Sequence, residues 1–181
     1  MRSPTPAAGA WSRAAAPLTR RFFGWLELSA LVVVLDQSAK WVVLSKLSFG
    51  EAVPVTSFFQ LVLVFNPGAA FSFLADHSGW QRWFFIVLAL VVCGWLLTML
   101  RTHQRELVLP LAFSLVIGGA IGNVIDRVVH GAVVDFLYFH IGRYGWPAFN
   151  VADSAITVGV ALMLLAQFRT PRDTTTTENP S

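Results

Sequence analysis

Long apolar runs, separated by short polar segments, dominate the chain. Four of them are long enough to cross the roughly 30 Å hydrocarbon core of a bilayer as helices, at residues 22–44, 83–100, 107–125 and 152–168. The first run is long, carries Glu27 and Asp36 and lacks a small-residue cleavage site, so we interpret it as a retained helix and not as a cleaved signal peptide. The pattern predicts a membrane protein with four transmembrane helices.

Two further apolar segments have a different character. Residues 53–66, "VPVTSFFQLVLVFN", and 132–150, "AVVDFLYFHIGRYGWPAFN", are rich in β-branched and aromatic residues, and the first contains Pro54 and is too short to span. Tyr138, Tyr144 and Trp146 belong to the residue types that collect at the membrane–water interface. We expect these segments to form a small β-rich cap that lies on the bilayer outside the cytoplasm.

The arginines predict the orientation. Of the 13 Lys and Arg residues, eight flank one side of the four spans; they are Arg2, Arg13, Arg20, Arg21, Arg101, Arg105, Arg169 and Arg172. The positive-inside rule makes this side cytoplasmic, so both termini are cytoplasmic and residues 45–82 and 126–151 lie outside. Residues 1–21 and 169–181 are polar or rich in Pro and Ala, and we expect disordered tails that flank a membrane domain at 22–168.

Composition narrows the function classes. The chain is 55% apolar and 13% charged, whereas a soluble domain is about a quarter charged. Its single cysteine, Cys93, excludes a disulfide framework, and its basic residues form no stripe of the kind that binds nucleic acid. The four histidines have no ligand-like spacing, and no HExxH, GxSxG or phosphate-binding motif occurs, so we expect no metal and no cofactor. Aspartate chemistry is left.

Two aspartates are candidates for hydrolysis. Asp135 lies in "VVDF" among apolar neighbours, and desolvation there raises the pKa of a carboxyl. Asp153 opens the fourth span, where the positive helix end favours a carboxylate, although an ordinary N-cap explains it equally well. If the fold brings the two together, one protonated and one ionised carboxyl can activate water and protonate a leaving nitrogen. Sequence spacing alone does not show that they meet.

Other polar and small residues in the spans have structural explanations. Asp36 and Lys40 are four residues apart on one helix face, which favours an ion pair over a catalytic role for Asp36. Asp126 is followed directly by Arg127, so its charge has a neighbour. Gly118 and Gly122 form a GxxxG motif, which allows close helix packing. The small residues Gly68, Ala69, Gly118 and Gly119 favour either close packing or room for a bound substrate.

Four segments, in order, resemble the signature blocks of lipoprotein signal peptidase, the bacterial signal peptidase II. They are "DQSAK" (36–40), "FNPGAAFSFL" (65–74), "GGAIGNVIDRVVHGAVVDF" (118–136) and "FNVADSAITVG" (149–159). The resemblance covers residues 22–168. It implies a four-helix membrane aspartyl endopeptidase with an extracytoplasmic β-cradle and a surface amphipathic segment.

The resemblance also implies a substrate and a location. Such an enzyme, in the bacterial cytoplasmic (inner) membrane, cleaves prolipoproteins on the N-terminal side of a cysteine that carries a diacylglyceryl group. Its partners are these prolipoproteins and membrane lipid, with no nucleic acid. The active site lies at the extracytoplasmic boundary and is complete in a monomer.

Carried over by position, the resemblance assigns roles to eight residues. Asp135 and Asp153 become the catalytic pair, and Asp126 and Asp36 support the site. Asn66, Asn123, Arg127 and Asn150 become substrate-binding residues. If Asp135 is not catalytic, Asp126 with Asp153 is the next pair to consider. Two other classes stay open: a small carrier that uses Asp36, Lys40 and Asp126, and a non-enzymatic assembly factor whose cap binds a partner.

Overall fold

The computed structural model describes residues 17–68 and 79–169. It contains four helices, α1 (Arg20–Lys46), α2 (Trp80–His103), α3 (Val108–His130) and α4 (Val151–Arg169). The four strands are β1 (Ala52–Pro54), β2 (Phe59–Asn66), β3 (Val133–Ile141) and β4 (Tyr144–Gly145). Most of the two expected tails, at 1–16 and 170–181, lies outside the described residues, and so does Ala69.

All four helices are long and apolar enough to cross a membrane, which confirms the expected spans. Their ends differ from the expected ones, because hydrophobicity marks the hydrocarbon core and a helix continues beyond it while its backbone hydrogen bonds remain favourable. The largest difference is in α3, which runs to His130 instead of ending at residue 125. Asp126 and Arg127 therefore belong to the last helical turns and not to an outer loop.

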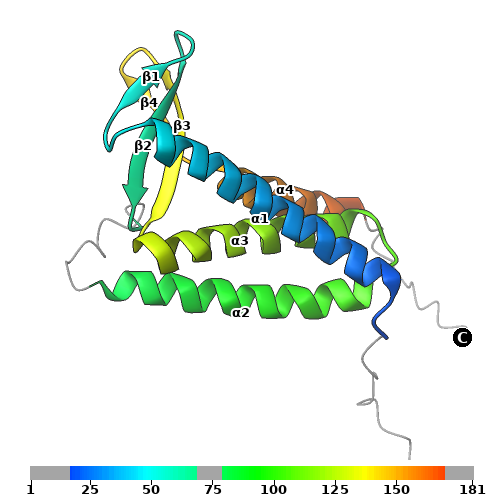
Figure 1. Ribbon diagram of the computed structural model, residues 1–181. Coiled ribbons are helices and arrows are strands. Elements are labelled where there is room, and N and C mark those ends of the chain that lie inside the picture. Colours follow the sequence, from blue (N-terminus) through cyan, green and yellow to red (C-terminus); the bar gives the residue numbers. More distant parts are fainter. Residues whose placement is uncertain (1–16, 69–78, 170–181) are drawn as a thin grey trace, which may run out of the picture.

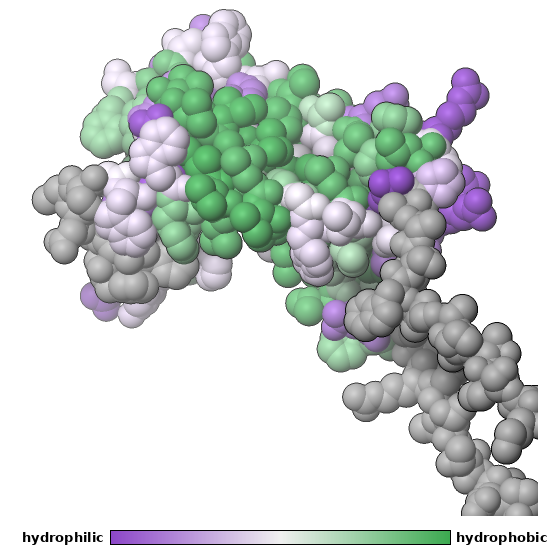
Figure 2. All heavy atoms as spheres, turned by 90° about the horizontal axis from the view of Figure 1, so that it is seen from below, coloured by the Kyte–Doolittle hydropathy of each residue, from purple (hydrophilic) through white to green (hydrophobic). Residues whose placement is uncertain are grey.

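Helix α3 is the centre of the bundle (Figure 1), in contact with α1, α2 and α4. Of its most apolar stretch 61% is buried inside the protein, against 28% or less for each of the other three. Those three helices expose many large hydrophobic side chains, among them Trp83, Val91 and Trp95 of α2. Figure 2 shows a broad hydrophobic area, in green, on the face of the molecule seen from below. Such an area is far too large for a water-exposed surface and suits contact with lipid tails.

Glycines of α3 allow this close packing. A Cβ atom at Gly118 would lie 2.7 Å from the carbonyl oxygen of Ser29 in α1, and one at Gly119 would collide with the carbonyl of Ala152 in α4. The alternative that Gly118 and Gly119 leave room for a substrate is therefore wrong, because neighbouring helices fill that space. A Cβ atom at Gly68 would likewise lie 2.6 Å from the ring of Phe85.

The strands form one antiparallel sheet in the order β1-β2-β3-β4, as expected of the β-rich cap. Pro54, which lacks a backbone N–H, is tolerated because it ends the edge strand β1. The sheet stands at one end of the bundle and extends sideways past α1 (Figure 1). Among the described residues every helix is one of the four spans, so the expected surface amphipathic segment corresponds to no separate helix there.

A small apolar cluster attaches the sheet to the bundle. Its buried members are Val43 near the end of α1, Leu63 of β2, and Val134 and Phe136 of β3. Val134 is completely inaccessible, and the first four residues of β3 are buried on both faces of the strand. The consequence is that Asp135, between two anchored apolar residues, is held at the junction of sheet and helices.

Candidate active site

Four acidic side chains meet where the sheet joins the helix ends. Asp36 comes from α1, Asp126 from α3, Asp135 from β3 and Asp153 from the first turn of α4. The first three are at most 1% exposed, and Asp153 is half-buried. Buried charges persist only when they are paired or hydrogen-bonded, so the partners of each carboxyl decide its role.

Asp135 is surrounded by amide donors. Its Oδ1 accepts a 2.8 Å hydrogen bond from Asn150 Nδ2, and its Oδ2 accepts one of 3.0 Å from Asn66 Nδ2. Burial, the largest influence, raises the pKa of Asp135 to about 6, and the nearby charge of Asp153 adds to the shift while the two asparagines oppose it. The expectation of a raised pKa is confirmed, with desolvation as its cause.

Asp153 is not the N-cap of α4. The cap is Asn150, whose Oδ1 accepts a 2.8 Å hydrogen bond from the backbone N–H of Asp153, three residues on. Asp153 sits one turn inside, and its Oδ1 accepts a 2.7 Å bond from Asn123 Nδ2. The N-cap role that the sequence left open for Asp153 is therefore filled by Asn150. The Asp153 carboxylate instead faces α3.

Two asparagines join the two carboxyls. Asn150 Nδ2, besides its bond to Asp135, lies 3.3 Å from Asn123 Oδ1. Asn123 in turn donates to Asp153, so a continuous chain of side-chain hydrogen bonds runs from Asp135 through both amides to Asp153. The fold thus brings together the two aspartates that sequence spacing left apart.

A buried lysine forms ion pairs with the other two acids. Lys40 Nζ lies 2.7 Å from Asp36 Oδ2 and 2.6 Å from Asp126 Oδ2, and it also bonds to Asn123 Oδ1 at 3.2 Å. The expected pair of Asp36 and Lys40 is confirmed. The charge of Asp126 acts on the adjacent Arg127, as expected, and its ion-pair partner is Lys40 of another helix, which the sequence did not indicate.

Both acids also bind backbone groups. Asp36 Oδ1 accepts a 2.9 Å hydrogen bond from the N–H of Ala152, which lies in the first turn of α4 and so has no acceptor within the helix. Asp126 Oδ2 accepts a 3.0 Å bond from the N–H of Val134, the residue before Asp135. Each acid thereby fixes the backbone that carries one member of the Asp135–Asp153 pair.

Arg127 lies beside this cluster. Its Nη1 donates to the carbonyl of Asn123 at 3.2 Å, and its guanidinium carbon lies 5.1 Å from the centre of the Phe85 ring. Its buried Nε has no hydrogen-bond partner among the described residues. A guanidinium with a free donor near two carboxyls is well placed to bind a carbonyl oxygen.

Sequence reasoning missed Gln37, although it lies in the "DQSAK" block. Its Nε2 donates to Asp126 Oδ1 at 2.9 Å and to the carbonyl of Gly122 at 3.2 Å, so it ties α1 to α3. Its position next to Asp36 was the available signal. Within the two described segments, no three or more His, Cys, Asp or Glu side chains are grouped so as to hold a metal ion.

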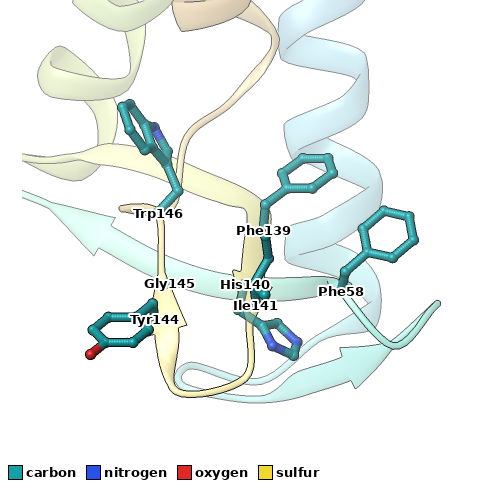
Figure 3. Close-up of a pocket in the computed structure, with 7 residues that line it drawn as sticks. All are labelled: Phe58, Phe139, His140, Ile141, Tyr144, Gly145 and Trp146. Atoms are coloured by element: carbon teal, nitrogen blue, oxygen red, sulfur yellow. The ribbon is translucent and has the colours of Figure 1, made fainter.

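A separate hollow lies at the far end of the sheet (Figure 3). Its volume is about 620 Å³. Phe58, Phe139 and Trp146 line it on the side of the sheet that faces the helices, and His140 and Tyr144 point the other way. The polar cluster around Asp135 is separate from this aromatic hollow.

Comparison with known proteins identifies the family of the chain. Residues 28–169 match the sequence model of a family described as signal peptidase (SPase) II. The chain belongs to the signal peptidase II family. It is similar to proteins named lipoprotein signal peptidase from Azoarcus sp. (strain BH72), with 70% identity over 80% of this chain and 82% of that one, and from Aeromonas hydrophila, with 53% identity over 82% and 90%.

Solved structures agree with the fold. The chain is similar to two bacterial membrane enzyme structures obtained by the in meso method at 1.9 and 2.3 Å resolution. The TM-scores are 0.73 and 0.71 and the identities 31% and 30%, over 82% and 88% of this chain and 95% and 94% of the others. Membership in the signal peptidase II family makes the protein a peptidase, and its four apolar helices make it a multi-pass membrane protein.

Proposed function

We propose that this signal peptidase II is an aspartyl endopeptidase that removes the signal peptide of bacterial prolipoproteins. The cut falls on the N-terminal side of a cysteine that bears a diacylglyceryl group. The similar proteins named lipoprotein signal peptidase support the substrate class. The observation that carries the aspartyl mechanism is the linked pair of Asp135 and Asp153 at the end of the bundle.

The two carboxyls have different surroundings, as an acid–base pair requires. Asp135 is buried between apolar residues, and its pKa of about 6 keeps a large part of it protonated at moderately acidic pH. Asp153 is half-buried, so water can stabilise its ionised form, and its Oδ1 accepts a hydrogen bond from the side-chain amide of Asn123. We assign Asp135 as the acid and Asp153 as the base.

The reaction follows from this assignment. The Asp153 carboxylate takes a proton from a water molecule while the water oxygen bonds to the carbonyl carbon of the scissile peptide. Protonated Asp135 donates a hydrogen bond to the carbonyl oxygen, which accepts the electron pair of the C=O double bond. When the C–N bond breaks, its electron pair leaves with the nitrogen, which takes up the proton held by Asp153.

The remaining polar residues hold the pair and the substrate. Asn66 and Asn150 donate to Asp135, and Asn123 donates to Asp153, so these amides orient both carboxyls and are near enough to bind substrate backbone. Arg127 supplies a further donor for a substrate carbonyl. Asp36 and Asp126 support the site through their bonds to the backbone of Ala152 and Val134.

The alternative pair of Asp126 and Asp153 has less support. Asp126 is bound on Oδ2 by Lys40 at 2.6 Å and on Oδ1 by Gln37 at 2.9 Å. A carboxylate whose two oxygens are occupied in this way is a poor general acid, because proton transfer at either oxygen would break its buried ion pair with Lys40 or its hydrogen bond from Gln37.

The site's place in the molecule suits a lipid-bearing substrate. Asp135 and Asp153 lie where the spans end and the sheet begins, so a cysteine with acyl chains reaches them from one leaflet. We assign the protein to the bacterial cytoplasmic (inner) membrane, with both termini in the cytoplasm and the site on the opposite side. All the proposed site residues come from one chain, so a monomer is sufficient.

Exchange of either aspartate tests the dyad. We expect Asp135→Asn and Asp153→Asn each to lower the cleavage rate of a diacylglyceryl-modified prolipoprotein by about a thousandfold or more, while thermal unfolding in detergent stays cooperative. The matched control is Glu51→Gln, which changes an exposed acid in the segment between α1 and the sheet and should keep the wild-type rate. Wild-type turnover by Asp135→Asn would disprove the assignment.

A further inference from the structure

A hollow lined by cationic side chains lies at the end of the bundle opposite the sheet. Its volume is about 380 Å³, and it is lined by Thr19, Arg20, Arg21 and Arg105. Arg20 and Arg21 begin α1, and Arg105 lies between α2 and α3. Hydrophilic side chains gather at this end in Figure 2, beside the apolar faces of the spans.

The arginines are held together although they repel one another. Arg21 Nη1 donates to the backbone carbonyl of Arg105 at 3.4 Å, which brings the start of α1 to the loop after α2. Among the residues that the structure describes, no carboxylate lines this hollow. The unpaired N–H groups at the start of α1 add positive potential. Guanidinium groups gathered in this way favour a phosphate group, whose oxygens accept from the arginine fork.

A second hollow, of about 480 Å³, continues from the first and shares Arg21 and Arg105 with it. Gly24, Trp25 and Leu107 give it an apolar wall. Open space lies beside Gly24, where a Cβ atom would meet nothing within 4 Å. The Trp25 indole N–H donates to the carbonyl of Gln104 at 3.2 Å, which fixes the ring. Glu106 is the acid in this lining, and it is exposed at the loop.

The two hollows together have the polarity of a lipid. We infer that they bind one anionic phospholipid, with its phosphate at Arg20, Arg21 and Arg105 and the first part of an acyl chain along Gly24, Trp25 and Leu107. A free phosphate would use only the first hollow. A zwitterionic lipid would bring its own cation close to the arginines. The position at the ends of membrane-spanning helices supplies the ligand at high local concentration.

Native mass spectrometry of the full-length protein in detergent measures this binding. The probe is phosphatidylglycerol, titrated against phosphatidylcholine with the same acyl chains. We expect one saturable phosphatidylglycerol site on the wild type, with at least about tenfold preference over phosphatidylcholine. The double variant Arg21→Gln/Arg105→Gln should lose that preference. The variant Arg21→Lys/Arg105→Lys keeps both positive charges and should retain most of the preference for phosphatidylglycerol.

The control is Arg143→Gln, which removes an exposed arginine at the opposite end and should bind like the wild type. Equal retention of phosphatidylglycerol by the double Gln variant, or an equal loss in Arg143→Gln, would overturn the site in favour of non-specific charge attraction. Displacement of the lipid by an equal concentration of inorganic phosphate would overturn the lipid assignment, because a free anion would then be the preferred ligand.

Discussion

An acid in an apolar strand is the feature of the sequence that needs most explanation. Asp135 is 1% exposed, between Val134 and Phe136, which anchor β3 in the apolar cluster. A bare carboxylate there would cost several kcal/mol. Two amide donors reduce that cost without neutralising the group, and the pKa of Asp135 remains raised, at about 6. The surroundings keep the residue buried and still able to exchange a proton.

This raised pKa predicts a pH-dependent stability. The carboxyl of Asp135 is protonated in the folded protein below pH 6, whereas in the unfolded chain it ionises above about pH 4. The contribution of protonated Asp135 to the free energy of unfolding is therefore fully present below pH 4 and is lost as the pH rises through 6. We expect the free energy of unfolding to fall by about 3 kcal/mol from this group. Thermal unfolding midpoints in detergent at several pH values between 4 and 8 measure it.

Asp135→Asn is the reference for that measurement, since its side chain stays neutral at every pH. The difference between wild type and variant should change through pH 4 to 6 and stay constant above 7. Midpoints that run parallel over the whole range would contradict the raised pKa.

At the residue scale the sequence identified the acids but not their partners. Asp135 and Asp153 stood out because ionisable groups are costly next to apolar segments. The contact of Lys40 with Asp126 joins two helices, and the capping of α4 by Asn150 depends on where the helix begins, so neither followed from local spacing. Gly118 and Gly119 illustrate the same limit, since only the fold shows what packs against them.

At the scale of elements, one polar face of α1 organises the site. Asp36, Gln37 and Lys40 lie on the side of α1 that meets α3 and the start of α4. Lys40 is 2% exposed, and among the described residues it is the only cation that forms ion pairs with two acids. Removal of one member of such a group leaves uncompensated charge in the protein interior.

We therefore expect Lys40→Gln to destabilise the protein by about 3–5 kcal/mol, because Asp36 and Asp126 would lose their shared counter-charge. Cleavage activity should fall as well, since those acids hold the backbone at Ala152 and Val134. The matched control is Lys46→Gln, an exposed lysine in the last turn of α1, which should behave like wild type. Chemical unfolding in mild detergent provides the comparison, and equal stability of the two variants would disprove the role of Lys40.

The elements themselves were largely predictable. Four spans and two strand-forming segments followed from apolar runs and from β-branched and aromatic content. Helix ends were less accurate, and the end of α3 mattered most because it moved Asp126 and Arg127 into the helix. Hydropathy is insensitive to such polar final turns, which are stabilised by bonds to other elements.

At the scale of the whole molecule, the sheet extends beyond the cross-section of the bundle (Figure 1). Its side that faces the helices carries Phe58, Phe139 and Trp146 (Figure 3), which is the side turned toward the bilayer when the helices span it. Aromatic side chains of this kind favour the headgroup region. The arginine cluster at the other end completes a molecule with distinct polarity at its two ends.

Cysteine labelling tests the orientation. Cys93 is the only cysteine and is buried, so Cys93→Ser gives a background without reactive thiols. The test uses cells whose outer envelope layers have been removed and whose cytoplasmic membrane is intact. In these cells a membrane-impermeant maleimide should label Arg143→Cys, next to β4, but not Glu106→Cys, between α2 and α3. Inverted membrane vesicles should give the opposite result. Labelling of Glu106→Cys in the intact cells would reverse the proposed topology.

The contribution of α4 to the site has a consequence for biosynthesis. Asp36 and Lys40 are translated first and pair with each other within α1, so neither of these two charges enters the membrane alone. Asn150 and Asp153 are translated last, and Asn150 is one of the two amides that bond to Asp135. On the proposed mechanism, a nascent chain that has inserted only three helices has no base for the reaction. Proteolytic activity therefore begins only once the last helix has docked, and a partly made enzyme cuts nothing.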